Sequence, residues 1–92
     1  MKTAANIFTE LRAGMTAPQT LDATANPNYP AAQEGDKRKI TNAGKVGGAS
    51  GKSCGVDDII YCVNTSVTGD EAAVGKNWVI LPKKAIEFFN GK

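Results

Sequence analysis

The amino-acid sequence predicts an α+β fold, in which a short N-terminal helix packs on a small antiparallel β-sheet of about four strands. An amphipathic helical pattern lies near the N-terminus, and two apolar runs typical of strands lie farther along the chain. Three of the four prolines lie between these two regions. With 92 residues, the chain has enough surface to bury for one small domain, residues 1–92, with one modest core.

Residues 4–13 are predicted to form the helix. Ile7 and Leu11 lie four residues apart and therefore share one helical face. The hydroxyl of Thr3 can accept a hydrogen bond from a free backbone N–H at the start of the helix. Gly14 suits the left-handed position that commonly follows a helix, so we expect the helix to end there.

Residues 16–36 are predicted to form a long irregular loop. The segment contains three prolines, which lack a backbone donor and disfavour helix in the residue before them. Leu21 and Tyr29 are its large apolar side chains, and we expect them to hold the loop against the core. A loop of this length in a compact domain is uncommon and is usually functional.

Residues 37–92 are predicted to be rich in β-structure. The candidate strands are KRKIT at 37–41, DDIIYCVNTSV at 57–67 and NWVIL at 77–81. In the second of these, Tyr61 and Cys62 point to opposite faces among other apolar residues, which is typical of a central strand. Trp78 is predicted to be a core anchor because apolar residues follow it directly.

The C-terminal stretch NWVILPKKAIEFF, residues 77–89, combines a strand, a proline and a tight turn before a second apolar run. In this order it resembles the end of SH3-like small barrels, which implies a five-stranded barrel-like sheet over residues 37–92. On this interpretation residues 83–90 form a last strand, as the β-forming phenylalanines favour. The alternative makes Pro82 the first residue of a C-terminal helix that Gly91 ends.

The stretch VGGASGKS, residues 46–53, ends in Gly-Lys-Ser as a phosphate-binding loop does. In the Walker A motif, however, a glycine stands where this chain has Val46, and a strand precedes the loop. Nucleotide hydrolysis is therefore excluded. Two interpretations stay open: a solvated flexible loop, or a binding loop whose glycine N–H groups form an anion-binding nest between Lys45 and Lys52.

The composition argues against an enzyme. The chain has no histidine, which excludes histidine-based catalysis and every histidine-containing metal site. Cys54 and Cys62 are predicted to be reduced, and neither has a histidine to activate it. Asp57 and Asp58 are neighbours in a predicted strand, so their side chains point apart. We therefore expect no catalytic residue, no metal and no cofactor.

The basic residues concentrate in residues 37–56, which contain no acidic residue. They are Lys37, Arg38, Lys39, Lys45 and Lys52, here called the basic block. Such a surface suits phosphate groups, and Lys83 and Lys84 would extend it if the sheet folds as predicted. Tyr29 is an additional candidate, because an exposed tyrosine stacks on bases or fills a partner's pocket; the alternative is that it pins its loop to the core.

These features favour a small non-enzymatic protein that docks on a nucleic-acid or nucleoprotein partner through the basic block. Phage-encoded inhibitors, including those that block CRISPR surveillance complexes, share this size and this lack of motifs. The alternative is a structural subunit of a virion or another assembly. The chain shows no secretory signal and no apolar run of membrane-spanning length. A cytoplasmic location is thus expected, in the host cytoplasm if a phage encodes the chain, without membrane or small-molecule partners.

Overall fold

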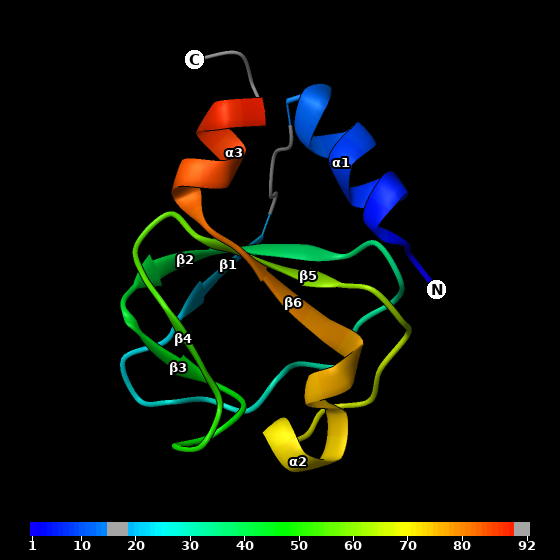
Figure 1. Cartoon of the computed structure of the whole chain (residues 1–92). Helices are drawn as coiled ribbons and strands as arrows, with labels where there is room; N and C mark the ends of the chain where they lie inside the picture. Colours follow the sequence, from blue (N-terminus) through cyan, green and yellow to red (C-terminus); the bar gives the residue numbers. More distant parts are fainter. Residues whose placement is uncertain (15–18, 90–92) are drawn as a thin grey trace.

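The computed structural model describes residues 1–14 and 19–89 and confirms an α+β fold (Figure 1). The elements in chain order are α1 (Ala4–Arg12), β1 (Gln19–Asp22), β2 (Lys37–Asn42), β3 (Gly44–Val46), β4 (Lys52–Cys54), β5 (Ile59–Cys62), α2 (Glu71–Val74), the 3₁₀ turn η1 (Gly75–Asn77), β6 (Trp78–Leu81) and α3 (Lys83–Phe89). None of the described helices has the length and apolarity needed to cross a membrane.

The predicted N-terminal helix is confirmed as α1. The Thr3 hydroxyl accepts from the Asn6 N–H at 3.3 Å, and the Asn6 side chain accepts from the Thr3 N–H at 3.1 Å. This reciprocal capping satisfies two donors that would otherwise lack partners. Gly14 follows the helix with a φ of 85°, the left-handed conformation expected of it.

The four-stranded sheet has the order β1-β2-β5-β6 and is mixed rather than antiparallel throughout. Strand β5 runs antiparallel to β2 and β6, but β1 runs parallel to β2, with Leu21 opposite Ile40. Within residues 16–36, the expectation of irregular structure is therefore wrong for Gln19–Asp22, because pairing with β2 overrides the weak local strand signal. Residues 16–18 lie outside the described part of the chain.

The barrel implied by the SH3-like resemblance is not closed. Strands β3 and β4 form a separate two-stranded hairpin. The segment after β6 is the helix α3 and not a last strand, so the prediction of a strand over residues 83–90 is wrong. The Pro82 carbonyl accepts from the Ile86 N–H at 3.1 Å, and Ile86 packs in the core only 9% exposed. This packing outweighs the β-propensity of the segment; Gly91 lies outside the described residues.

Two apolar cores lie on the two faces of the sheet. In β5, Ile59 and Tyr61 face α1 and α3, whereas Ile60 and Cys62 face the β3–β4 hairpin. The helix-side core consists of Leu11, Ile59, Tyr61, Val63, Leu81 and Ile86. The hairpin-side core consists of Ala23, Tyr29, Ile40, Val46, Cys54, Ile60, Cys62, Val74 and Trp78. Figure 1 shows the helices α1 and α3 beside each other on one side of the sheet.

Candidate functional site

Folding breaks up the basic block. Three of its five members form ion pairs with acidic residues from other parts of the chain. The pairs are Lys37–Glu10 at 3.2 Å, Lys39–Asp57 at 3.2 Å and Lys52–Glu71 at 2.8 Å. Arg38 is partly buried and Lys45 is exposed. The five residues therefore do not form one positively charged surface, because most of their charge is balanced locally.

Lys52 has a structural position. Its ammonium group donates to Glu71, to the Tyr29 hydroxyl at 3.1 Å and to the Gly75 carbonyl at 2.9 Å. It also lies 5.4 Å from the centre of the Tyr29 ring. The hydrogen bond from Lys52 holds the pKa of Glu71 below its ordinary value. These contacts join the β3–β4 hairpin to α2 and leave Lys52 little freedom to meet a partner.

Tyr29 lies in the core and not on the surface. It is 0% exposed and stacks on Trp78 with 5.4 Å between ring centres. Its hydroxyl donates to Glu71 Oε1 at 2.7 Å. Tyr29 therefore pins its loop, as the alternative expectation held, and the ring is not open to a base or a partner's pocket. Trp78 is 1% exposed, which confirms the prediction that it is a core anchor.

The glycine-rich stretch forms the tip of the β3–β4 hairpin. The N–H groups of Gly47 and Gly48 both donate to the Pro27 carbonyl, at 2.7 and 3.2 Å. The Gly47 carbonyl in turn accepts from the Glu71 N–H at 2.8 Å. Both glycines have positive φ values, 96° and 87°, which only glycine adopts without strain. Of the two interpretations left open, the anion-binding nest does not apply to these two groups, because the protein itself uses their N–H groups.

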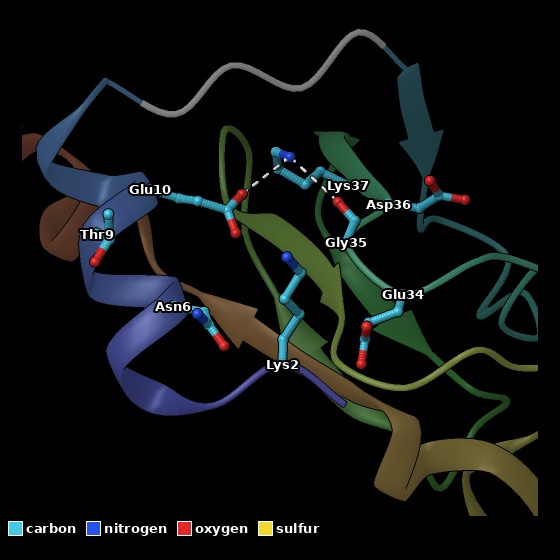
Figure 2. A pocket seen from close by; sticks show the side chains of 8 residues that line it. All are labelled: Lys2, Asn6, Thr9, Glu10, Glu34, Gly35, Asp36 and Lys37. Carbon is cyan, nitrogen blue, oxygen red and sulfur yellow. Dashed lines mark hydrogen bonds and ion pairs between the residues drawn. The ribbon is translucent and has the colours of Figure 1, made fainter.

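A polar pocket of about 490 Å³ lies between α1 and the chain that leads into β2 (Figure 2). Its lining residues are Lys2, Asn6, Thr9, Glu10, Glu34, Gly35, Asp36 and Lys37. The side chain of Lys2 extends into this pocket and passes close to Gly35, where an added Cβ would lie 3.5 Å from Lys2 Cε. Within the described residues, Lys2 has no ion-pair partner, whereas Lys37 has one.

Glu10 organises one wall of this pocket. It accepts a hydrogen bond from the Tyr61 hydroxyl and forms the ion pair with Lys37. Lys37 also donates to the Gly35 carbonyl at 3.2 Å and lies 5.6 Å from the centre of the Tyr61 ring. This group was not predicted from the sequence. The available signal was the position of Glu10, three residues after Ile7 on the face that packs on the sheet.

The titratable groups described do not suggest nucleophilic chemistry. Cys54 and Cys62 are 7% and 0% exposed, and burial raises the pKa of both thiols. Raised values disfavour the thiolate, which is the reactive form. Among residues 1–14 and 19–89, no group of three or more histidine, cysteine, aspartate or glutamate side chains is arranged to hold a metal ion.

Exposed lysines gather beside the turn Gly55–Asp58. Asp57 at this turn contacts two lysines, Lys39 at 3.2 Å and Lys83 at 3.9 Å, and Lys83 also contacts Glu87 at 4.0 Å. The two lysine side chains are 49% and 53% exposed, and Val56 at the tip of the turn is 54% exposed. We call Lys39, Lys83 and the exposed Lys84 the turn lysines.

Comparisons of the whole chain with protein families, with curated proteins and with solved structures find no match.

Proposed function

We propose that this chain is a non-enzymatic binding protein that docks on a nucleic-acid or nucleoprotein partner through the turn lysines. The observation that supports this proposal most directly is the sharing of Asp57 by Lys39 and Lys83. Lys83 also contacts Glu87 at 4.0 Å, so both ammonium groups have acidic partners within the chain. Lys84, which forms no ion pair among the described residues, adds a positive charge beside them. A nucleoprotein complex of the kind that phage-encoded inhibitors block is the partner that we propose first.

The exposure of these lysines suits contact with phosphate groups. A surface ion pair contributes only about 0–1 kcal/mol, so a phosphate can displace or bridge it readily. Lys84 is exposed beside Lys83 and adds a third ammonium group. Neutralisation of phosphates by lysines releases counterions, which makes binding of this kind strong at low salt and weak at high salt.

The turn beside Lys39 and Lys83 is held by hydrogen bonds to β2 and to the start of α3. The Asp57 N–H donates to the Ile40 carbonyl at 2.8 Å, and Asp58 accepts from the Lys83 N–H at 2.9 Å. Asp57 has a φ of 72°, a left-handed value that aspartate tolerates better than most residues. Val56 is thereby presented at the tip, where it can contact a sugar, a base or an apolar part of the partner.

The proposal is tested with a variant in which all three turn lysines are changed: Lys39→Gln, Lys83→Gln, Lys84→Gln. The matched control, Arg12→Gln, Lys45→Gln, Lys76→Gln, removes the same charge from other exposed positions. Binding to a fluorescent single-stranded RNA and to a DNA duplex is measured over a range of salt concentrations. We expect the first variant to lose binding and to reduce the salt slope by about 0.7–0.9 for each phosphate contact removed.

If both variants bound RNA and DNA equally, any loss of nucleic-acid binding would depend on net charge alone. This outcome would refute the assignment of the binding site to the turn lysines. Absence of binding by the unchanged protein, combined with self-association at high concentration, would instead support the structural-subunit alternative. Salting-out salts separate these cases further, because they strengthen apolar subunit packing and weaken phosphate binding.

A further inference from the structure

The polar pocket between α1 and the chain that leads into β2 contains an ionised group that the protein leaves without a partner. The ionised side chains that line the pocket are Lys2, Glu10, Glu34, Asp36 and Lys37. Lys37 and Glu10 pair with each other at 3.2 Å, so their charges are balanced within the wall of the pocket.

The two remaining acidic side chains are also engaged, whereas Lys2 is not. Glu34 pairs with the N-terminal ammonium group, and Asp36 Oδ2 accepts a hydrogen bond from the Gln33 N–H at 2.9 Å. The Lys2 ammonium group has neither an ion pair nor a hydrogen bond within residues 1–14 and 19–89. The balance of the pocket therefore lacks one negative charge at Lys2.

The backbone and the side-chain stem of Lys2 are held in place. The Lys2 N–H donates to the Val63 carbonyl at 2.6 Å, and the residue is partly buried. Its stem passes beside Gly35, whose N–H donates to the Cys62 carbonyl at 2.8 Å. Figure 2 shows the side chain extending into the pocket. Lys2 therefore presents its ammonium group inside the pocket, where an anionic group of a ligand can meet it.

Asn6 offers further donors at the same pocket. Its Oδ1 atom accepts from the Thr3 N–H at 3.1 Å and from the Thr3 hydroxyl at 3.0 Å, which fixes the orientation of the amide. The Asn6 Nδ2 group consequently points away from these contacts, and it has no hydrogen-bond partner in the described part of the chain. Ammonium and amide N–H groups are donors that suit a carboxylate.

The wall formed by residues 34–36 offers acceptors instead. Glu34 and Asp36 each use one carboxylate oxygen in the contacts described above. Glu34 Oε1 and Asp36 Oδ1 can therefore accept hydrogen bonds from hydroxyl or ammonium groups. The same carboxylates repel a ligand that carries several negative charges, because like charges raise the energy of each other.

We propose that this pocket binds a small monocarboxylate that also carries hydroxyl or ammonium groups, which is the chemistry of a hydroxy acid or an amino acid. Its carboxylate would bind Lys2 and Asn6, and its donor groups would bind Glu34 and Asp36. The volume of about 490 Å³ lies within the range of small-molecule sites. The site shares no residue with the turn lysines, so this inference is independent of the proposed function.

A titration of the full, isotope-labelled chain followed by nuclear magnetic resonance provides the first test. Glycerate and serine are the ligands, and both should shift the Lys2 Cε–H signal and the Gly35 amide signal until they saturate. Glycerol lacks the carboxylate and propionate lacks the donors, so each should bind at least about tenfold more weakly. Malate carries a second carboxylate and should also bind more weakly than glycerate. Tighter binding of serine would identify an amino-acid site, and tighter binding of glycerate a hydroxy-acid site.

Variants of Lys2 test the assignment of the carboxylate. Lys2→Met removes the ammonium group but keeps the stem and the backbone bond to Val63, and we expect it to weaken binding of glycerate and serine at least about tenfold. Lys2→Arg keeps the charge and should retain most of the binding. Lys45→Met removes an exposed lysine of β3 and is the matched control. Circular dichroism checks that each variant is folded.

Absence of saturable shifts with both glycerate and serine would overturn the proposal. Binding of glycerol or malate as tight as that of glycerate would overturn the monocarboxylate assignment, and unchanged binding by Lys2→Met would overturn the role of Lys2. The ligand series uses the unchanged protein, so it decides the proposal even if a variant fails to fold. Loss of RNA binding in the turn-lysine variant with intact glycerate binding would separate this inference from the proposed function.

Discussion

Lys52 and Glu71 are nineteen residues apart in the chain, and the Lys52 ammonium nitrogen lies 2.8 Å from Glu71 Oε2. The same ammonium group reaches the Tyr29 hydroxyl, whose ring stacks on Trp78. One lysine thereby connects the β3–β4 hairpin, the helix α2 and the hairpin-side core. A residue that the sequence marked as a candidate for phosphate contact is instead part of the internal structure.

The other face of the sheet repeats this arrangement. Glu10 of α1 accepts from the Tyr61 hydroxyl and pairs with Lys37, which lies over the Tyr61 ring. In both groups a glutamate from a helix is joined to a buried tyrosine and a lysine from a strand. Each group fastens a short helix to a neighbouring strand.

The Lys52 contacts predict a measurable loss of stability. We expect Lys52→Met to lower the free energy of unfolding by about 1 kcal/mol, because several hydrogen bonds are lost at a site that is only partly screened by solvent. Lys45→Met, at an exposed position of the same hairpin, is the matched control and should change little. Chemical denaturation of both variants measures the difference, and equal effects would contradict the structural role of Lys52.

The lowered pKa of Glu71 predicts a dependence on acid. The ordinary pKa is 4.5, and the folded-state value lies below it, chiefly because of the hydrogen bond from Lys52. The ionised carboxylate therefore stabilises the fold above pH 4.5. As the pH falls from there through the folded-state pKa, this contribution is lost. The stability difference between wild type and Glu71→Gln should accordingly shrink as the solution is acidified.

Chemical denaturation at neutral pH and at several acidic pH values measures this effect. Glu87→Gln removes an exposed carboxylate on α3 and serves as the control. A difference between wild type and Glu71→Gln that stays constant into the acid range would show that the carboxylate charge is not what stabilises this contact.

Glycine replacements test how closely β3 approaches the backbone at Ala23. A Cβ at Gly44 would lie 1.8 Å from the Ala23 carbonyl oxygen, a backbone atom that has no rotamer with which to move away. We expect Gly44→Ala to destabilise the protein by about 2–4 kcal/mol. At Gly55 the nearest atom to an added Cβ is Asp58 Oδ2 at 3.7 Å, so Gly55→Ala should be tolerated. Thermal melts of both variants compare them directly, and similar melting temperatures would contradict the packing described here.

The two cysteines should be inert in the native protein. Both are buried and unpaired, and burial raises the pKa of each thiol. We expect a thiol reagent such as dithionitrobenzoate to react with neither cysteine until denaturant is added, and then with both. Rapid reaction of one thiol in native buffer would show that its part of the core opens readily.

Several secondary-structure elements are predicted by sequence signals that lie within a few residues of each other. Thr3 and Gly14 bound α1 through local capping and a left-handed turn, and the apolar alternation around Tyr61 produces the central strand. Trp78 was also identified as core from its apolar neighbours. Such signals can be recognised in the sequence alone, because hydrogen-bond periodicity and capping act over one helical turn or one strand.

The basic block shows where this kind of inference fails for a site. Lys39 was identified from the sequence as a candidate and remains exposed, but its neighbour Lys83 comes from the far end of the chain. The net charge of a sequence segment does not predict the charge of the surface that it forms. The reason is that any element that packs nearby can supply an acidic ion-pair partner. The polar pocket beside Glu10 was missed for the same reason, since its lining comes from two distant segments.

Local sequence is therefore sufficient here for the N-terminal helix, the two apolar strands and the exclusion of histidine chemistry. Long-range packing decides the rest: Gln19–Asp22 is a strand because β2 offers it a parallel partner, and the segment after Pro82 is a helix because Ile86 completes the helix-side core. Packing also decides which lysines form ion pairs within the chain and which do not. Backbone pairing and burial act between residues far apart in the chain, and their free energies exceed the weak local preferences of these segments.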